Sequence, residues 1–163
     1  MAKVERPPRE ELVLLLQRGY RYALSLTHDT PDAEDLVQDA WTSLLSRGGG
    51  YHVGYLFAAI RNRFIDRMRR NRLVAVEPLA DIVEEGTGDE EALLADRAAL
   101  RQALGRLGPD EREALYLFAV EGFTHAEIAT MTARPEGTVS SLITRARQRM
   151  RRSFAIPTER AVK

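Results

Sequence analysis

Apolar residues recur at helical spacing along most of the chain, and the alternation typical of β-strands is nowhere sustained. The spacing predicts a first helix from Glu10, a second from Thr30 to Gly48 and a third over about residues 55–72. Thr30 is expected as the N-cap of the second helix, because Pro31 lacks the N–H that the first helical position leaves unbonded. We therefore predict an all-α fold.

The helical pattern stops in the middle of the chain and then resumes. Residues 73–92 contain the helix breakers Pro78, Gly86 and Gly88, together with many acidic side chains. Helical spacing returns after this segment. We therefore predict two small helical domains, residues 10–72 and 93–153, joined by an acidic flexible linker over residues 73–92.

The C-terminal part of the chain has the pattern of a helix-turn-helix. Thr124 and Glu127 have the spacing of a capping box at the start of a short helix, and Pro135 disfavours its continuation. A second helix is expected from Gly137. Its apolar stripe consists of Val139, Leu142, Ile143, Ala146 and Met150. Since its other faces are polar and basic, the pattern predicts DNA binding, with a merely solvated helical hairpin as the alternative.

The charges are segregated although the formal net charge is zero. Residues 61–72 hold six Arg and one Asp, a net +5, and residues 145–152 hold five Arg and no acid, a net +5. Between them, residues 77–99 hold eight acids and one Arg, a net −7. Phosphate attraction acts over about one Debye length, ~10 Å at moderate salt, so local charge matters more than the sum. Nucleic-acid contacts are predicted at both basic segments, with a solvated basic face as the alternative for residues 61–72.

Composition excludes several classes of site. The chain of 163 residues has no Cys, which rules out disulfides, thiolate metal sites and cysteine nucleophiles. Its three histidines, His28, His52 and His125, are far apart, and no phosphate loop or nucleophile elbow is present. The acids Asp32, Glu34, Asp35 and Asp39 fit a solvated or partner-binding face better than a cation site. No apolar run reaches the roughly 18 residues that span a membrane, and the N-terminus is too charged for a secretory signal. We expect a cytoplasmic protein that is not an enzyme, with no catalytic residue, metal, cofactor or membrane insertion.

Four motifs, in this order, resemble a known family. DAEDLVQDAW at residues 32–41 and YLFAAIRN at residues 55–62 resemble region two of bacterial sigma-70 factors of the extracytoplasmic-function (ECF) group. LGPDEREA at residues 107–114 and GTVSS at residues 137–141, with a following Arg-Ala-Arg, resemble region four. The resemblance implies an RNA polymerase sigma factor that directs transcription initiation at promoters with −10 and −35 elements.

The resemblance also implies three groups of site residues. Docking on the β′ clamp helices of core RNA polymerase would use Asp35, Gln38, Asp39 and Thr42. Recognition and opening of the −10 element would use Asn62, Arg61, Asp66, Arg69, Arg70 and Tyr55. Reading of the −35 duplex would use Ser140, Ser141, Thr144, Arg145, Arg147 and Arg149.

The implied partners are core polymerase, through its β′ clamp helices and β flap, promoter DNA and an anti-sigma factor. One alternative is a sigma-like module that only sequesters an anti-sigma factor. Ser140 and Leu142, which stand where the family often has basic residues, motivate this alternative. A stand-alone helix-turn-helix regulator is a further alternative, but it leaves residues 10–72 without a role.

Overall fold

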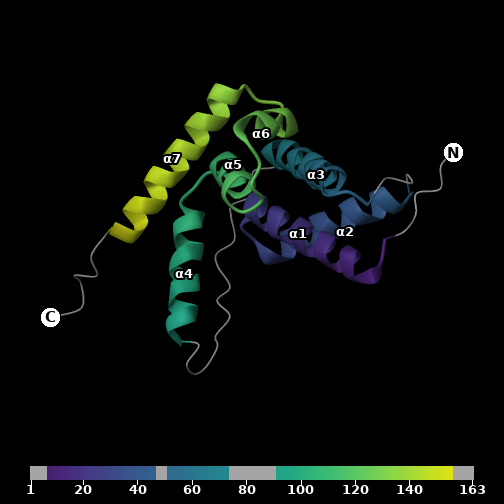
Figure 1. Cartoon of the computed structure of the whole chain (residues 1–163), viewed down its shortest axis with the longest axis horizontal. Helices are drawn as coiled ribbons and strands as arrows, with labels where there is room; N and C mark the ends of the chain where they lie inside the picture. The colour runs from purple at the N-terminus through teal and green to yellow at the C-terminus, as the bar shows by residue number, and fades with distance from the viewer. Residues whose placement is uncertain (1–6, 47–50, 74–90, 156–163) are drawn as a thin grey trace. The chain divides into compact units, whose positions relative to one another are not determined.

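A computed structural model describes residues 7–46, 51–73 and 91–155 (Figure 1). Within these ranges the regular elements are all α-helices, which confirms the predicted all-α class. The chain divides into two compact units, residues 1–76 and 77–163. Most of the predicted linker, residues 73–92, lies outside the described residues, and its two ends belong to helices.

The first unit is a three-helix bundle of α1 (Arg9–Thr27), α2 (Thr30–Ser46) and α3 (Val53–Leu73). Each helix packs against the other two. Their buried apolar side chains are Leu12, Leu15, Tyr22, Ala23, Leu26, Ala33, Leu36, Ala40, Leu56, Phe57 and Ile60. At the centre, the rings of Tyr22 and Phe57 are stacked with centroids 4.3 Å apart. This core fixes α2 and α3, which carry the predicted site residues, against the same supporting helix.

A glycine allows α1 and α3 to approach closely. Gly19 is buried, and a Cβ atom at this position would lie 2.7 Å from Cδ2 of Leu56. Leu56 itself is fully buried, so its side chain has little room to move. The close spacing of these two helices therefore depends on glycine, which has no Cβ, at position 19.

The start of α2 differs from the prediction. The carboxylate of Asp29 accepts a hydrogen bond from the backbone N–H of Asp32 at 2.9 Å, and its carbonyl accepts one from Ala33 at 3.0 Å. Asp29 therefore caps this end, while Thr30 is already helical. The prediction of Thr30 as N-cap is wrong by one residue, because the short carboxylate of Asp29 satisfies the free backbone donor first.

The second unit contains α4 (Glu91–Gly105), α5 (Pro109–Ala119), α6 (His125–Thr132) and α7 (Glu136–Ala155). Helix α7 packs against all three others. The buried apolar side chains are Ala103, Leu107, Ala114, Leu117, Ile128, Val139, Leu142, Ile143 and Ala146. Four members of the predicted α7 stripe are thus buried, and Met150 is half-buried. Val120, which follows the last residue of α5, is 60% exposed.

The capping box of α6 is confirmed. The hydroxyl of Thr124 accepts the backbone N–H of Glu127 at 3.3 Å, and the Glu127 carboxylate accepts the N–H of Thr124 at 2.8 Å. This bond, with a second from the Thr124 hydroxyl, lowers the pKa of Glu127. Helix α6 ends at Thr132, and the C-cap residue Ala133 adopts a left-handed conformation with φ of 52°. Helix α7 begins at Glu136, one residue before the predicted start.

Candidate nucleic-acid and protein interfaces

Helix α2 presents a polar face to solvent. Asp35, Gln38, Asp39 and Thr42 are all exposed, and their spacing of three and four residues puts them on one side of the helix. The Thr42 hydroxyl donates to the carbonyl of Gln38 at 2.8 Å. The carboxylates and the amide remain at the surface, where they can accept hydrogen bonds from a protein partner.

An ion pair joins this helix to α3. The guanidinium of Arg67 lies 2.7 Å from the carboxylate of Asp32 and 3.8 Å from that of Asp35. Both acids are more than half exposed, so the pair contributes at most about 1 kcal/mol to stability. Sequence reasoning missed this connection because 35 residues separate Arg67 from Asp32. The ion pair with Arg67 of α3 restrains the carboxylate of Asp35, one of the predicted docking residues.

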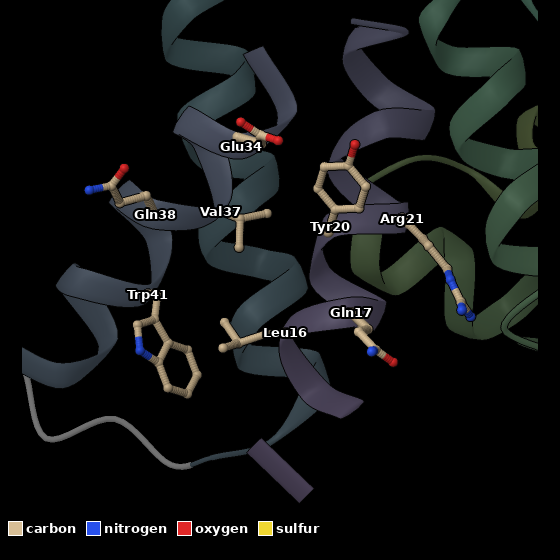
Figure 2. Close-up of a pocket in the computed structure, with 8 residues that line it drawn as sticks. All are labelled: Leu16, Gln17, Tyr20, Arg21, Glu34, Val37, Gln38 and Trp41. Carbon is tan, nitrogen blue, oxygen red and sulfur yellow. The ribbon is translucent and has the colours of Figure 1, made fainter. Parts of the chain in front are cut away.

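A groove of about 600 Å³ runs between α1 and α2 (Figure 2). Its apolar side chains are Leu16, Tyr20, Val37 and Trp41, and its polar ones are Gln17, Arg21, Glu34 and Gln38. Gln38 therefore belongs both to the groove and to the polar face of α2. The Trp41 ring also lies 6.0 Å from the ring of Tyr51, across the connection to α3. An apolar groove beside polar acceptors suits a protein partner.

Helix α3 presents an exposed stripe that combines cations, an amide and an aromatic ring. Asn62, Asp66, Arg69 and Arg70 are exposed, and Tyr55 is 62% exposed. At about 100° per residue these five positions fall on one side of the helix. Within the stripe, Arg69 lies 4.0 Å from the Asp66 carboxylate. Cations beside an exposed aromatic ring are the combination that binds single-stranded nucleic acid.

Arg61, also predicted here, is not on this stripe. It is half-buried, and helical spacing places it on a different side from Asn62. His52, which sequence reasoning did not assign, lies near the stripe instead: its ring is 6.4 Å from that of Tyr55. Its Nδ1 accepts the backbone N–H of Gly54 at 3.1 Å, so it also supports the first turn of α3.

Helix α7 exposes most of the residues predicted to read duplex DNA. Ser141, Thr144, Arg145, Arg147 and Arg149 are exposed, and Ser140 is half-buried. Leu142, by contrast, is 7% exposed and belongs to the core. A basic residue at position 142 would disturb the packing of this unit. Leucine at that position is therefore no evidence of a lost DNA contact.

The three predicted arginines of α7 have different surroundings. Arg149 donates to the Glu111 carboxylate at 3.0 Å, while Nε of Arg145 lies 4.0 Å from the same group. The guanidinium of Arg147 lies over the ring of Phe118, 4.8 Å from its centroid. Sequence reasoning missed these partners on α5, where Glu111, Arg112 and Glu113 are all buried. A periodic signal was present for Glu111 and Glu113, which lie three and four residues before the buried Ala114 and Leu117.

The buried charged side chains of α5 have hydrogen-bond partners. Arg112 donates to the carbonyl of Leu107 at 2.5 Å, and burial lowers its pKa. No polar side-chain atom buried within the described part of the chain lacks a hydrogen-bond partner. The buried polar groups in the first turn of α5 therefore all have hydrogen-bond partners, and α5 packs against both α6 and α7.

The described ranges contain no cluster of three or more His, Asp or Glu side chains arranged to hold a metal ion. Nor does any helix there combine the length and the apolar character needed to cross a membrane.

Comparison with known proteins assigns both units. The family model described as Sigma-70 region 2 matches residues 13–74, and the one described as Sigma-70, region 4 matches residues 97–150. The ECF RNA polymerase sigma factor SigM of Mycobacterium tuberculosis is 30% identical over 138 residues, covering 82% of this chain and 69% of the relative. SigL of the same species is 34% identical over 131 residues, covering 75% and 74%.

A solved structure is similar over nearly the whole chain. It is the sigma factor RpoE from Bartonella quintana, crystallised in complex with the anti-sigma factor NepR. The two chains share 29% sequence identity with a TM-score of 0.68, over 91% of this chain and 97% of the other.

Proposed function

Because this chain belongs to the ECF group of sigma-70 RNA polymerase sigma factors, we propose that its two units divide promoter recognition between them. As a sigma factor it is a transcription initiation factor and not an enzyme: it binds core RNA polymerase and promoter DNA. The observation that carries the proposal is the order of the two matched regions, each of which coincides with one helical unit.

The polar face of α2 is proposed to dock on the β′ clamp helices of core polymerase. Asp35, Gln38 and Asp39 offer exposed acceptors on one side of the helix. The groove beside them adds the apolar ring of Trp41. Polar acceptors that rim an apolar anchor are the usual composition of a protein interface. Thr42 is assigned to the same surface.

The stripe of α3 is proposed to capture the −10 element as single-stranded DNA. Arg69 and Arg70 supply charge for the backbone, Tyr55 supplies a ring on which a base can stack, and Asn62 can hydrogen-bond the edge of an extruded base. Asp66 lies among these residues: its carboxylate is 4.0 Å from Arg69, and its backbone carbonyl accepts a hydrogen bond from Arg70 at 3.3 Å. Arg61 is assigned a supporting position, since it lies off the stripe.

The exposed side of α7 is proposed to enter the major groove of the −35 element. Ser140, Ser141, Thr144 and Arg145 occupy the first half of the helix, where a recognition helix contacts base edges. Arg147 and Arg149 flank them. The β flap of the polymerase is the proposed protein contact of this unit.

An anti-sigma factor is the proposed regulator, because the similar RpoE was crystallised with one. The protein is proposed to act in the cytoplasm, where polymerase and promoter DNA meet.

A decoy that only sequesters an anti-sigma factor would have no use for the exposed cations of α3, so these residues favour the initiation factor.

Run-off transcription tests the proposal. Core RNA polymerase is incubated with the full-length protein and a library of templates randomised upstream of the start site. Specific transcripts that require the protein, from templates sharing two spaced elements, are expected. Tight binding of an anti-sigma factor without any transcript from the library would favour the decoy instead.

A further inference from the structure

A buried carboxylate of α5 faces two arginines of α7. Glu111 is 6% exposed. Its carboxylate accepts hydrogen bonds from the backbone N–H of Gly108 at 3.2 Å and from the guanidinium of Arg149 at 3.0 Å. Nε of Arg145 is 4.0 Å away, beyond hydrogen-bonding distance. One negative charge is therefore placed beside two of the cations that could contact DNA.

These contacts divide the two arginines between different roles. A buried carboxylate without a cation is strongly destabilising, so Glu111 must retain a counter-ion in the folded protein. Arg149 fills this place, since it alone of the two makes the short bond. Arg145 instead directs Nε toward the carbonyl of Ser141 at 3.4 Å. The two side chains are similarly exposed, 57% for Arg145 and 52% for Arg149, so the distance to Glu111 is what separates them. The positive charge left over after pairing thus belongs to Arg145.

We propose that Glu111 is a positioning residue of the recognition helix, which holds Arg149 as a structural counter-ion and leaves Arg145 to contact DNA. The inference rests on the proposed reading of duplex DNA by α7, and it withdraws Arg149 from the set of direct contacts. The first turn of α5 thereby decides how many phosphates the recognition helix neutralises.

The salt dependence of DNA binding measures this directly. Each phosphate neutralised by a cation contributes about 0.9 to the slope of log affinity against log salt concentration. The full-length protein is titrated into a fluorescent duplex that carries the upstream element of a promoter selected by run-off transcription. A purely structural role for Glu111 would change the melting temperature but not this slope.

Three variants give distinct expectations. Glu111→Gln releases Arg149, so the slope should steepen by about 0.9. The double variant Glu111→Gln with Arg149→Gln removes a neutral pair, so its slope should equal that of the wild type. Arg145→Gln, the matched single loss of an exposed cation, should flatten the slope by about 0.9. If Glu111→Gln alone does not fold, the double variant, which lacks both members of the ion pair, provides the test.

Two results would overturn the inference. One is a double variant whose slope is flatter than that of the wild type by the amount seen for Arg145→Gln, since Arg149 would then contact phosphate in the native protein. The other is an unchanged slope in folded Glu111→Gln. Either result leaves the proposed function standing if the wild type supports run-off transcription. A wild type without transcription or duplex binding would instead refute the proposed function.

Discussion

The guanidinium of Arg134 lies 3.2 Å from the carboxylate of Glu113, which is 2% exposed. Arg134 belongs to the turn between α6 and α7, and Glu113 belongs to α5. A second carboxylate, that of Asp110, lies 2.6 Å from the same guanidinium but is largely exposed. The turn of the helix-turn-helix is thus tied to α5 by one buried and one exposed ion pair.

Replacing the arginine should destabilise the second unit. Arg134→Ala leaves the buried Glu113 carboxylate without this cation, at an expected cost of about 2–3 kcal/mol. The single tryptophan, Trp41, lies in the first unit, so its fluorescence reports the urea unfolding of the first unit and not of the second. We expect the circular dichroism transition of the second unit to move to lower urea while the tryptophan fluorescence transition stays in place. Asp110→Ala, which removes only the exposed partner, should cost about 0.5 kcal/mol. Equal effects of the two variants would contradict this ranking.

The close packing of α1 on α3 makes Gly19 sensitive to substitution. Gly19→Ala gains helix propensity of roughly 1 kcal/mol but forces its Cβ against Leu56, and overpacking of this kind costs about 1–3 kcal/mol. We expect net destabilisation of the first unit, seen as an earlier tryptophan fluorescence transition in urea. Gly137→Ala is the control, because a Cβ there meets no atom within 4 Å. It should leave the second unit as stable or slightly more stable. A more stable Gly19→Ala variant would show that Leu56 yields easily.

The capping box of α6 predicts a pH dependence. Two hydrogen bonds lower the pKa of the Glu127 carboxyl below its ordinary value of 4.5. The larger effect comes from the backbone N–H of Thr124 and the smaller from its hydroxyl. A carboxyl whose pKa is depressed by folding stabilises the protein above its unfolded pKa, and this contribution is lost as pH falls through the folded pKa. Below about pH 4.5, the melting temperature of the second unit should therefore fall more steeply in the wild type than in Glu127→Gln. Parallel curves throughout the acidic range would exclude this role for Glu127.

The polar face of α2 predicts the effect of removing its charges on holoenzyme assembly. Asp35→Asn combined with Asp39→Asn removes two exposed acceptors from the proposed docking surface and should weaken binding to core polymerase by roughly tenfold or more. Fluorescence titration of labelled protein with core enzyme measures the affinity. Glu10→Gln combined with Glu11→Gln is the matched control, because it removes two exposed carboxylates from the first turn of α1, outside the proposed face. Unchanged affinity of the double variant would remove α2 from the interface.

The α3 stripe predicts a defect in promoter opening. Asn62→Ala removes one hydrogen-bonding amide from the proposed base site, a loss of about 1 kcal/mol and hence about fivefold in the open-complex equilibrium. Permanganate reactivity of unpaired thymines should fall, while binding of the holoenzyme to duplex promoter stays nearly constant. Asn71→Ala changes an exposed asparagine farther along the same helix and should behave as the wild type. If both variants open the promoter normally, Asn62 does not hold the base.

The positions of the helices followed closely from local chemistry. The Thr124 and Glu127 side chains mark the start of α6, and Pro135 marks the interval before α7, because capping and the restriction before proline act within a few residues. The start of α2 was missed by one residue, since Asp29 and Thr30 are both competent caps and only the backbone geometry distinguishes them. The stripe of α3 was also accessible from spacing, apart from the half-buried Arg61.

The sequence by itself determined the helical class, the buried stripe of α7 and the two basic segments, because helical periodicity and charge are local properties of the chain. Tertiary structure alone decided the pairing of those charges. Glu111 meets Arg149 across 38 residues, and Arg67 meets Asp32 across 35. Side chains so far apart in sequence meet only once helices pack. Which arginine of α7 has a carboxylate partner is therefore set by the packing of α5.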